Sequence, residues 1–121
     1  MDTWPSPEIV IQQQLDAYNN RDLEAWLATY ADDAQQFEFP ATLLASGHVQ
    51  MRERSAPRFQ EHNLHARLLK CTVMGHIVID HEEVTRTFPE GQGRIELICI
   101  YEVRNGQIQN ASFVFGAKTL D

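Results

Sequence analysis

"RIELICIYEVRNGQIQNASFVFGA", residues 94–117, predicts a β-hairpin and with it much of the fold class. The Asn105-Gly106 pair is a strong signal for a two-residue hairpin turn, because both residue types tolerate a positive φ. In the first strand of the hairpin, polar and apolar residues alternate, so that one side is apolar from end to end. We expect this side to face the core; it carries Ile95, Leu97, Cys99, Tyr101 and Val103.

The opposite side of the same strand has polar ends around an apolar centre formed by Ile98 and Ile100. Apolar surface on a sheet is usually covered, and a second copy of the chain is a ready cover. We therefore expect a homodimer that forms through the sheet.

Two further long strands precede the hairpin. "LHARLLKCTVM" and "HIVIDHEEVTRTF" are separated by Gly75, and "PEGQG" turns the chain into the next strand. All three connections are short, which favours antiparallel neighbours.

Helical spacing dominates the N-terminal part of the chain. Ser6-Pro7 is a favourable helix start, and Asp22 is a favourable cap for a second helix. A short strand is predicted at residues 34–39, and a third helix follows Gly47 until Pro57 stops or kinks it. The inward side chains of the first two helices are Val10, Ile11, Gln14, Leu15 and Tyr18, then Leu23, Trp26, Leu27 and Tyr30.

This order of elements predicts an α+β fold, with helices on one face of a mostly antiparallel sheet. A length of 121 residues without a linker or repeat indicates a single domain over residues 1–121. The net charge of −7 disfavours nucleic acid as a partner. No apolar run is long enough for a membrane span, and the N-terminus lacks the features of a signal peptide. Two cysteines do not make a disulfide framework, so we expect a soluble, reduced, cytoplasmic protein.

Two segments, "LDAYNNRDLEAWLATYADDA" and "IYEVRNGQI…FVFG", carry a family resemblance. With them the chain resembles the nuclear transport factor 2-like superfamily over nearly its whole length, and most of all its SnoaL-like and ketosteroid isomerase-like branches. The resemblance implies a cone-shaped fold in which three N-terminal helices and a curved sheet enclose an apolar pocket. It also implies a small hydrophobic ligand in that pocket and a dimer.

The segments "RDLEAWLATYADDA" and "SGHVQMRERS" resemble the bacterial ketosteroid isomerase pattern. In that alignment the catalytic base of the family falls on Glu38, although Phe39 separates Glu38 from Pro40 where the family has proline directly after the base. The oxyanion-binding tyrosine falls on Gln14, its assisting aspartic acid on Cys99, and a further pocket tyrosine on Ser55. Of the proton-handling groups, only a carboxylate is retained.

The residues themselves leave two interpretations of Glu38 open. Strict alternation between Phe37 and Phe39 places the glutamate on the solvent side of the strand. The alignment instead places it in the pocket, where burial would raise its pKa and make it a general base.

Other residues are candidates for the pocket wall. Tyr18, Tyr30 and Tyr101 lie on inward-facing stripes and could replace the missing oxyanion donors, or be ordinary core tyrosines. The wall is predicted to include Trp26, Cys99, Phe113 and Phe115.

Charged and titratable side chains complete the list of candidates. His65 could line the pocket mouth; His81, next to Asp80, could exchange protons with Glu38 or belong to the dimer surface. The basic third helix, with Arg52, Arg54 and Arg58, could steer an anionic ligand, but solvated charges are the commoner case and we assign these arginines no site role.

No histidine or cysteine spacing predicts a metal site, and no cofactor is expected. The leading hypothesis is a cofactor-independent enzyme that transfers a proton on a small, hydrophobic, carbonyl-bearing molecule. Glu38 would be the base, with Tyr30, Gln14 and Tyr18 orienting or polarising the substrate. The alternative is a binding or association module of the same fold without chemistry. A third reading, epoxide hydrolysis, would resemble another branch of the superfamily, which uses an arginine flanked by two aspartates. No first-helix or sheet arginine is evident that would complete that set.

Overall fold

The computed structural model describes residues 3–121. Within them the order of elements is helix, helix, two strands, helix, four strands. The helices are α1 (Pro7–Asn19), α2 (Leu23–Ala28) and α3 (Gly47–Phe59). The strands are β1 (Tyr30–Glu38), β2 (Thr42–Ser46), β3 (His65–Met74), β4 (Ile77–Phe88), β5 (Gly91–Arg104) and β6 (Gln107–Leu120).

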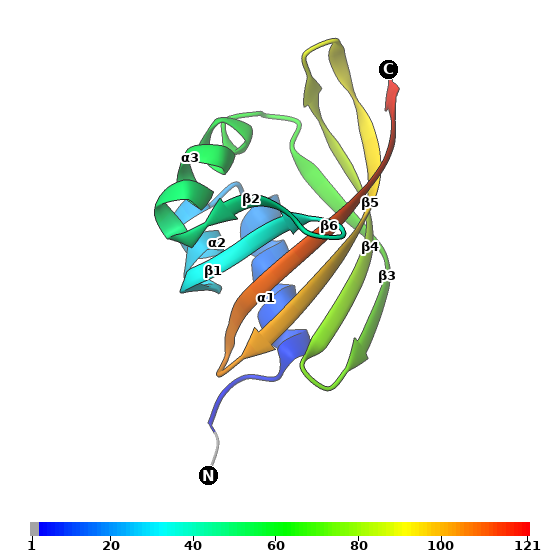
Figure 1. Cartoon of the computed structure of the whole chain (residues 1–121). Helices are drawn as coiled ribbons and strands as arrows, with labels where there is room; N and C mark the ends of the chain where they lie inside the picture. Colours follow the sequence, from blue (N-terminus) through cyan, green and yellow to red (C-terminus); the bar gives the residue numbers. More distant parts are fainter. Residues whose placement is uncertain (1–2) are drawn as a thin grey trace.

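The strands form one strongly curved sheet in the order β2-β1-β6-β5-β4-β3. Every neighbouring pair is antiparallel except β1 and β6, which are parallel. The helices lie on the concave side of this sheet, and within residues 3–121 its other side carries no helix (Figure 1). The predicted α+β class, with three N-terminal helices packed on a curved, mostly antiparallel sheet, is confirmed.

The β5–β6 hairpin forms as its turn residues predict. Asn105 and Gly106 have φ values of 52° and 74°, the pair of positive values that a type I′ turn requires. Leu97, Cys99, Tyr101 and Val103 are buried on the inner side of β5, and Ile95 packs against the same core.

The first two helices begin where their caps predict. The Ser6 side chain accepts a hydrogen bond from the Ile9 N–H, and Asp22 accepts one from the Ala25 N–H at 3.1 Å. The second helix ends earlier than predicted, at Ala28. The Ile108 N–H donates to the Thr29 carbonyl at 2.8 Å, which draws the chain into the sheet alongside β6.

Tyr30 is therefore the first residue of a strand, and its predicted place on the second helix is wrong. The sheet also contains a strand that the sequence analysis missed, Thr42–Ser46, which pairs with the end of β1. Its residues are only partly buried and show no strong alternation, so its partner strand rather than its own pattern determines its conformation. The third helix continues through Pro57 to Phe59.

Candidate functional site

A cavity lies between the three helices and the concave face of the sheet. Its volume is about 70 Å³, and both layers contribute to its wall. Eight side chains predicted for the site line it: Gln14, Tyr18, Trp26, Tyr30, Cys99, Tyr101, Phe113 and Phe115. Because they come from α1, α2, β1, β5 and β6, only the folded chain brings them together.

Aromatic packing shapes the helical side of the cavity. The Trp26 ring lies 5.0 Å from Tyr30 and 5.3 Å from Phe59 between ring centroids. Tyr18 meets Phe59 edge to face at 5.4 Å. Interlocked rings of this kind restrict one another, so the polar ends of Tyr18, Tyr30 and Trp26 are held in fixed positions.

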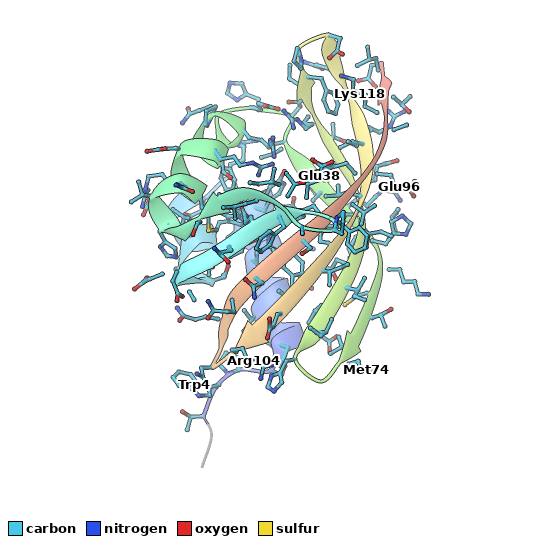
Figure 2. The ribbon with its side chains drawn as sticks, in the orientation of Figure 1. Trp4, Glu38, Met74, Glu96, Arg104 and Lys118 are labelled. Carbon is cyan, nitrogen blue, oxygen red and sulfur yellow. The ribbon has the colours of Figure 1, made fainter. Side chains whose placement is uncertain are left out.

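Glu38 does not line this cavity. It is exposed at the end of β1 (Figure 2 labels it). Gln36 takes the inward position instead and is 1% exposed. Glu38 is the last residue of β1 and lies beyond Tyr30 and Gln36, the residues of this strand that line the cavity. The register shift between β1 and β2 adds Leu44 to β2 and leaves this end of β1 regular. The predicted pocket position of Glu38 is therefore wrong.

The two candidate histidines also lie outside the cavity. His65 is exposed at the start of β3. His81 lies on the outer side of β4, where its Nε2 atom is 2.7 Å from the Glu96 carboxylate. Glu96 itself lies on the side of the sheet remote from the helices (Figure 2). Neither His65 nor His81 is part of the cavity wall. Of the two positions that the sequence left open for His81, the structure has the outward one, because alternation along β4 directs Asp80 and Glu82 inward.

The carboxylate of the cavity is Glu82, which the sequence analysis did not select. It is 5% exposed and lies on the inner side of β4 opposite Leu97. Burial raises its pKa to about 7, repulsion from the buried Asp80 adds to the effect, and a hydrogen bond with the Cys99 thiol opposes it. Glu82 is thus a carboxylate that exchanges its proton near neutral pH.

A sequence signal for Glu82 did exist. In "VIDHEEV", residues 78–84, one side of the strand carries Val78, Asp80, Glu82 and Val84. The two valines at the ends of this set indicate that this side of the strand is buried, so the two carboxylates between them are expected to be buried as well. The pattern is easy to miss because four consecutive polar residues, Asp80 to Glu83, make this part of the strand read as solvent-exposed.

The hydroxyl and thiol groups around Glu82 remain protonated at neutral pH. Burial raises the pKa of Tyr18 to about 12, and burial also raises the pKa values of Tyr30, Tyr101 and Cys99. Each of these side chains can therefore donate a hydrogen bond into the cavity.

Several buried polar atoms of the cavity wall have no hydrogen-bond partner within residues 3–121. Leaving such a group unpaired costs about 1–3 kcal/mol, so unpaired groups tend to cluster where a ligand or water binds. The atoms are Gln14 Oε1, Trp26 Nε1, Tyr30 Oη, Gln36 Oε1 and Arg58 Nε.

Helix α3 adds a basic component to the wall through Arg54 and Arg58. Ser55, which the alignment placed in the pocket, lies between them and is buried. Burial lowers the pKa of Arg54, and repulsion from Arg58 and Arg86 lowers it further. Two of the arginines to which the sequence analysis assigned no role thus border the cavity.

Groups suited to holding a metal ion are not found in the described part of the chain, where no three His, Cys, Asp or Glu side chains gather. Likewise, none of the helices in residues 3–121 combines the length and the apolar character that crossing a bilayer would require.

Comparison with known proteins identifies relatives of this arrangement. The sequence model of the SnoaL-like domain matches residues 11–111. Comparison with curated proteins finds no match.

Solved structures share the fold at low sequence identity. An uncharacterized cystatin fold protein from Novosphingobium aromaticivorans has a TM-score of 0.83 and 20% identity, covering 91% of this chain and 98% of its own. The Δ5-3-ketosteroid isomerase from Mycobacterium sp. has a TM-score of 0.79 and 19% identity, covering 95% and 98%. SalBIII, an epoxide hydrolase/cyclase-like enzyme in pyran ring formation in the polyether salinomycin, has a TM-score of 0.80 and 13% identity, covering 91% and 90%.

Proposed function

The chain belongs to the SnoaL-like domain family, within the nuclear transport factor 2-like superfamily, and we propose that it is a cofactor-independent enzyme that transfers a proton on a small carbonyl compound bound in the cavity. Glu82, in place of Glu38, is the proton acceptor in this proposal. The isomerase and cyclase-like enzyme among the structural neighbours are consistent with it, but their low identity supports the fold alone.

The observation that carries the proposal is the position of Glu82. A general base works best when its pKa is near the working pH, and burial beside Asp80 raises the pKa of Glu82 to about 7. The ionised carboxylate would remove a proton from the carbon next to the carbonyl group. The C–H electron pair would form an enolate, and protonated Glu82 would return the proton to the same carbon or to a conjugated one.

The enolate oxygen needs hydrogen-bond donors, and the cavity supplies them. The Tyr30 hydroxyl is buried without a hydrogen-bond partner in residues 3–121. Tyr18 is protonated at neutral pH, because burial raises its pKa to about 12. Preorganised donors of this kind stabilise developing negative charge because they need not reorient during the reaction. Tyr18 and Tyr30 are therefore the proposed oxyanion donors, with Gln14 as a further polar contact to the substrate.

The size of the cavity favours a small substrate. About 70 Å³ is well below the roughly 300–1,000 Å³ of a pocket for a drug-sized ligand. Trp26, Phe113 and Phe115 would contact the apolar part of the molecule.

A binding module without chemistry is the second candidate. The unpaired polar atoms of Gln14, Trp26 and Gln36 favour it, because a bound ligand would satisfy them whether or not it reacts. The two functions differ in whether Glu82 exchanges protons with the bound molecule.

Deuterium exchange distinguishes an enzyme from a binding module. The protein is incubated in D₂O with small ketones and oxo acids, and deuterium at the carbons next to the carbonyl group is followed by NMR. We expect catalysed exchange that falls by about 10²–10⁴-fold in Glu82→Gln, as is usual for loss of a general base. Glu38→Gln is the matched control and should retain the wild-type rate. Bound ligand without catalysed exchange, or equal rates in both variants, would overturn the enzyme proposal.

We also propose that two copies of the chain pair through the outer side of the sheet. Apolar side chains on adjacent strands lie exposed there, notably Ile77 and Ile79 on β4, Ile98 on β5 and Val114 on β6. An isologous contact would cover the same residues of both copies at once.

A further inference from the structure

Two arginines border the cavity, and a third lies close enough to repel them. Arg54 and Arg58 line the cavity from α3, and Arg86 extends the inner side of β4 two residues beyond Val84, which also lines it. The Arg86 side chain is 22% exposed, with its guanidinium carbon 4.8 Å from the centre of the Phe88 ring. The charges interact: burial and then the Arg58 charge lower the pKa of Arg86.

These guanidinium groups belong to half-buried residues and have few partners. The Nε atoms of Arg58 and Arg86 are buried without a hydrogen-bond partner in the described chain. Arg86 donates a long hydrogen bond to the Thr87 carbonyl at 3.4 Å, and its one ion pair in residues 3–121 is with Glu61 at 4.0 Å. In the same residues neither Arg54 nor Arg58 takes part in an ion pair.

Arg52 provides the contrast on the same helix. It is exposed, and it forms a two-point ion pair with Glu24. Glu24 of α2 therefore neutralises Arg52, which faces solvent. Arg54 and Arg58, which line the cavity, have no ion-pair partner in residues 3–121. Such an arrangement is unfavourable unless an anion binds between the guanidinium groups, since buried charges are normally paired.

Glu82 does not serve as that anion. No ion pair joins it to an arginine in residues 3–121, and Asp80 and Cys99 are the groups that act on it. The cavity thus has a proton-accepting carboxylate in one part of its wall and unpaired positive charge in another.

We infer that the substrate of this cavity carries a carboxylate, which Arg58 binds with support from Arg54 and Arg86, and that the substrate class is a small oxo acid. The inference rests on the proposed function, because it names the substrate class of the same site. Guanidinium groups bind carboxylates through paired, charge-assisted hydrogen bonds, for which the unpaired Nε–H of Arg58 is available. With its carboxylate held there, the molecule would extend its carbonyl end along the cavity towards Glu82.

The test compares an acid with its neutral ester. Binding of 4-oxopentanoate and of methyl 4-oxopentanoate is measured by NMR titration of the whole chain above neutral pH. We expect the acid to bind at least about tenfold more tightly than the ester, since hydrogen bonds to charged groups have free energies that correspond to about 10- to 100-fold in affinity.

Variants then locate the carboxylate. Arg58→Gln should lose most of this preference for the acid, Arg58→Lys should retain part of it, and the control Arg52→Gln should retain all of it. Circular dichroism and the amide spectrum establish that each variant is folded. If Arg58→Gln does not fold, Arg58→Lys and Arg86→Gln take its place, and both are expected to weaken binding of the acid but not of the ester.

Several outcomes would overturn the inference. They are equal binding of acid and ester by the wild type, no binding of the acid, and unchanged selectivity in the folded Arg58 and Arg86 variants. Displacement of the acid by lower concentrations of inorganic phosphate would contradict a carboxylate in favour of a phosphate. Selective binding of the acid without deuterium exchange would leave the inference intact and remove the proposed reaction, so the two failures are distinguishable.

Discussion

Asn19 and Ala66 are joined by two hydrogen bonds that tie the end of α1 to the edge strand β3. The Asn19 Nδ2 group donates to the Ala66 carbonyl at 3.0 Å, and the Ala66 N–H donates to Asn19 Oδ1 at 2.8 Å. The side-chain amide thus acts as a short substitute strand next to β3. Because Ala66 also lines the cavity, this contact sets the position of the helix that contributes Gln14 and Tyr18.

Loss of this contact should destabilise the fold. Asn19→Ala leaves both Ala66 groups without their partner, and we expect the free energy of unfolding to fall by about 2 kcal/mol. Urea denaturation measures it. Asn19→Asp keeps the acceptor and removes the donor, so it should lie between the wild type and the alanine variant; an alanine variant as stable as the wild type would contradict the prediction.

Glu82 should make the stability of the protein depend on pH. Its pKa is raised from 4.5 to about 7 on folding, so the native state holds the proton more tightly than the unfolded chain does. Its contribution is therefore fully present below the unfolded pKa and is lost as the pH rises through the folded pKa. The loss is on the order of 3 kcal/mol from about pH 4 to about pH 8.

Glu82→Gln should remove this part of the pH dependence. Denaturant midpoints of the wild type and the variant, measured at several pH values, give the comparison. The variant should gain stability relative to the wild type as the pH rises, because it has no proton to lose. A constant difference between the two proteins across the range would show that Glu82 has the same pKa in both states.

The proposed reaction should follow the same titration. Deuterium exchange needs ionised Glu82, so its rate should rise as the pH passes through about 7 and then level off. Rates with a neutral ketone give the profile without ionisation of the substrate. A profile that is flat between the ordinary pKa of a carboxyl group and pH 8 would assign the base to another residue.

Introducing a charge at the outer side of the sheet should prevent dimer formation. Ile98 is exposed between Glu96 and Ile100 on the same side of β5, and a carboxylate there would face its own copy across a two-fold axis. We expect Ile98→Glu to sediment as a monomer under conditions in which the wild type is a dimer. Val49→Glu, an exposed substitution on α3, is the control; a monomeric wild type would refute the dimer itself.

Most of the fold could be predicted from local patterns. The turn at Asn105-Gly106, the caps at Ser6 and Asp22 and the alternation along β5 each depend on neighbouring residues alone, and the structure confirms all of them. The strand Thr42–Ser46 and the strand conformation of Tyr30 could not be predicted in this way. Tyr30 pairs with Ile108, which is far away in the sequence. The strand Thr42–Ser46 has no clear alternation of its own.

The candidate site could likewise be predicted only in part from the sequence. The sequence by itself determined which side chains face inward from the long strands and helices, because periodicity relates residues of one element, and eight of the predicted site residues do line the cavity. It did not determine which carboxylate is buried. Glu38 is exposed at the last residue of β1, whereas Glu82 lies in the middle of β4 on its inner side and is buried.

Only the tertiary structure brings Glu82 close to Cys99 and leaves it without an arginine partner in residues 3–121. The elevated pKa of Glu82 arises mainly from desolvation, and desolvation depends on everything that packs around a group. The residues that line the cavity come from eight elements of the chain, so no single stretch of sequence contains these surroundings.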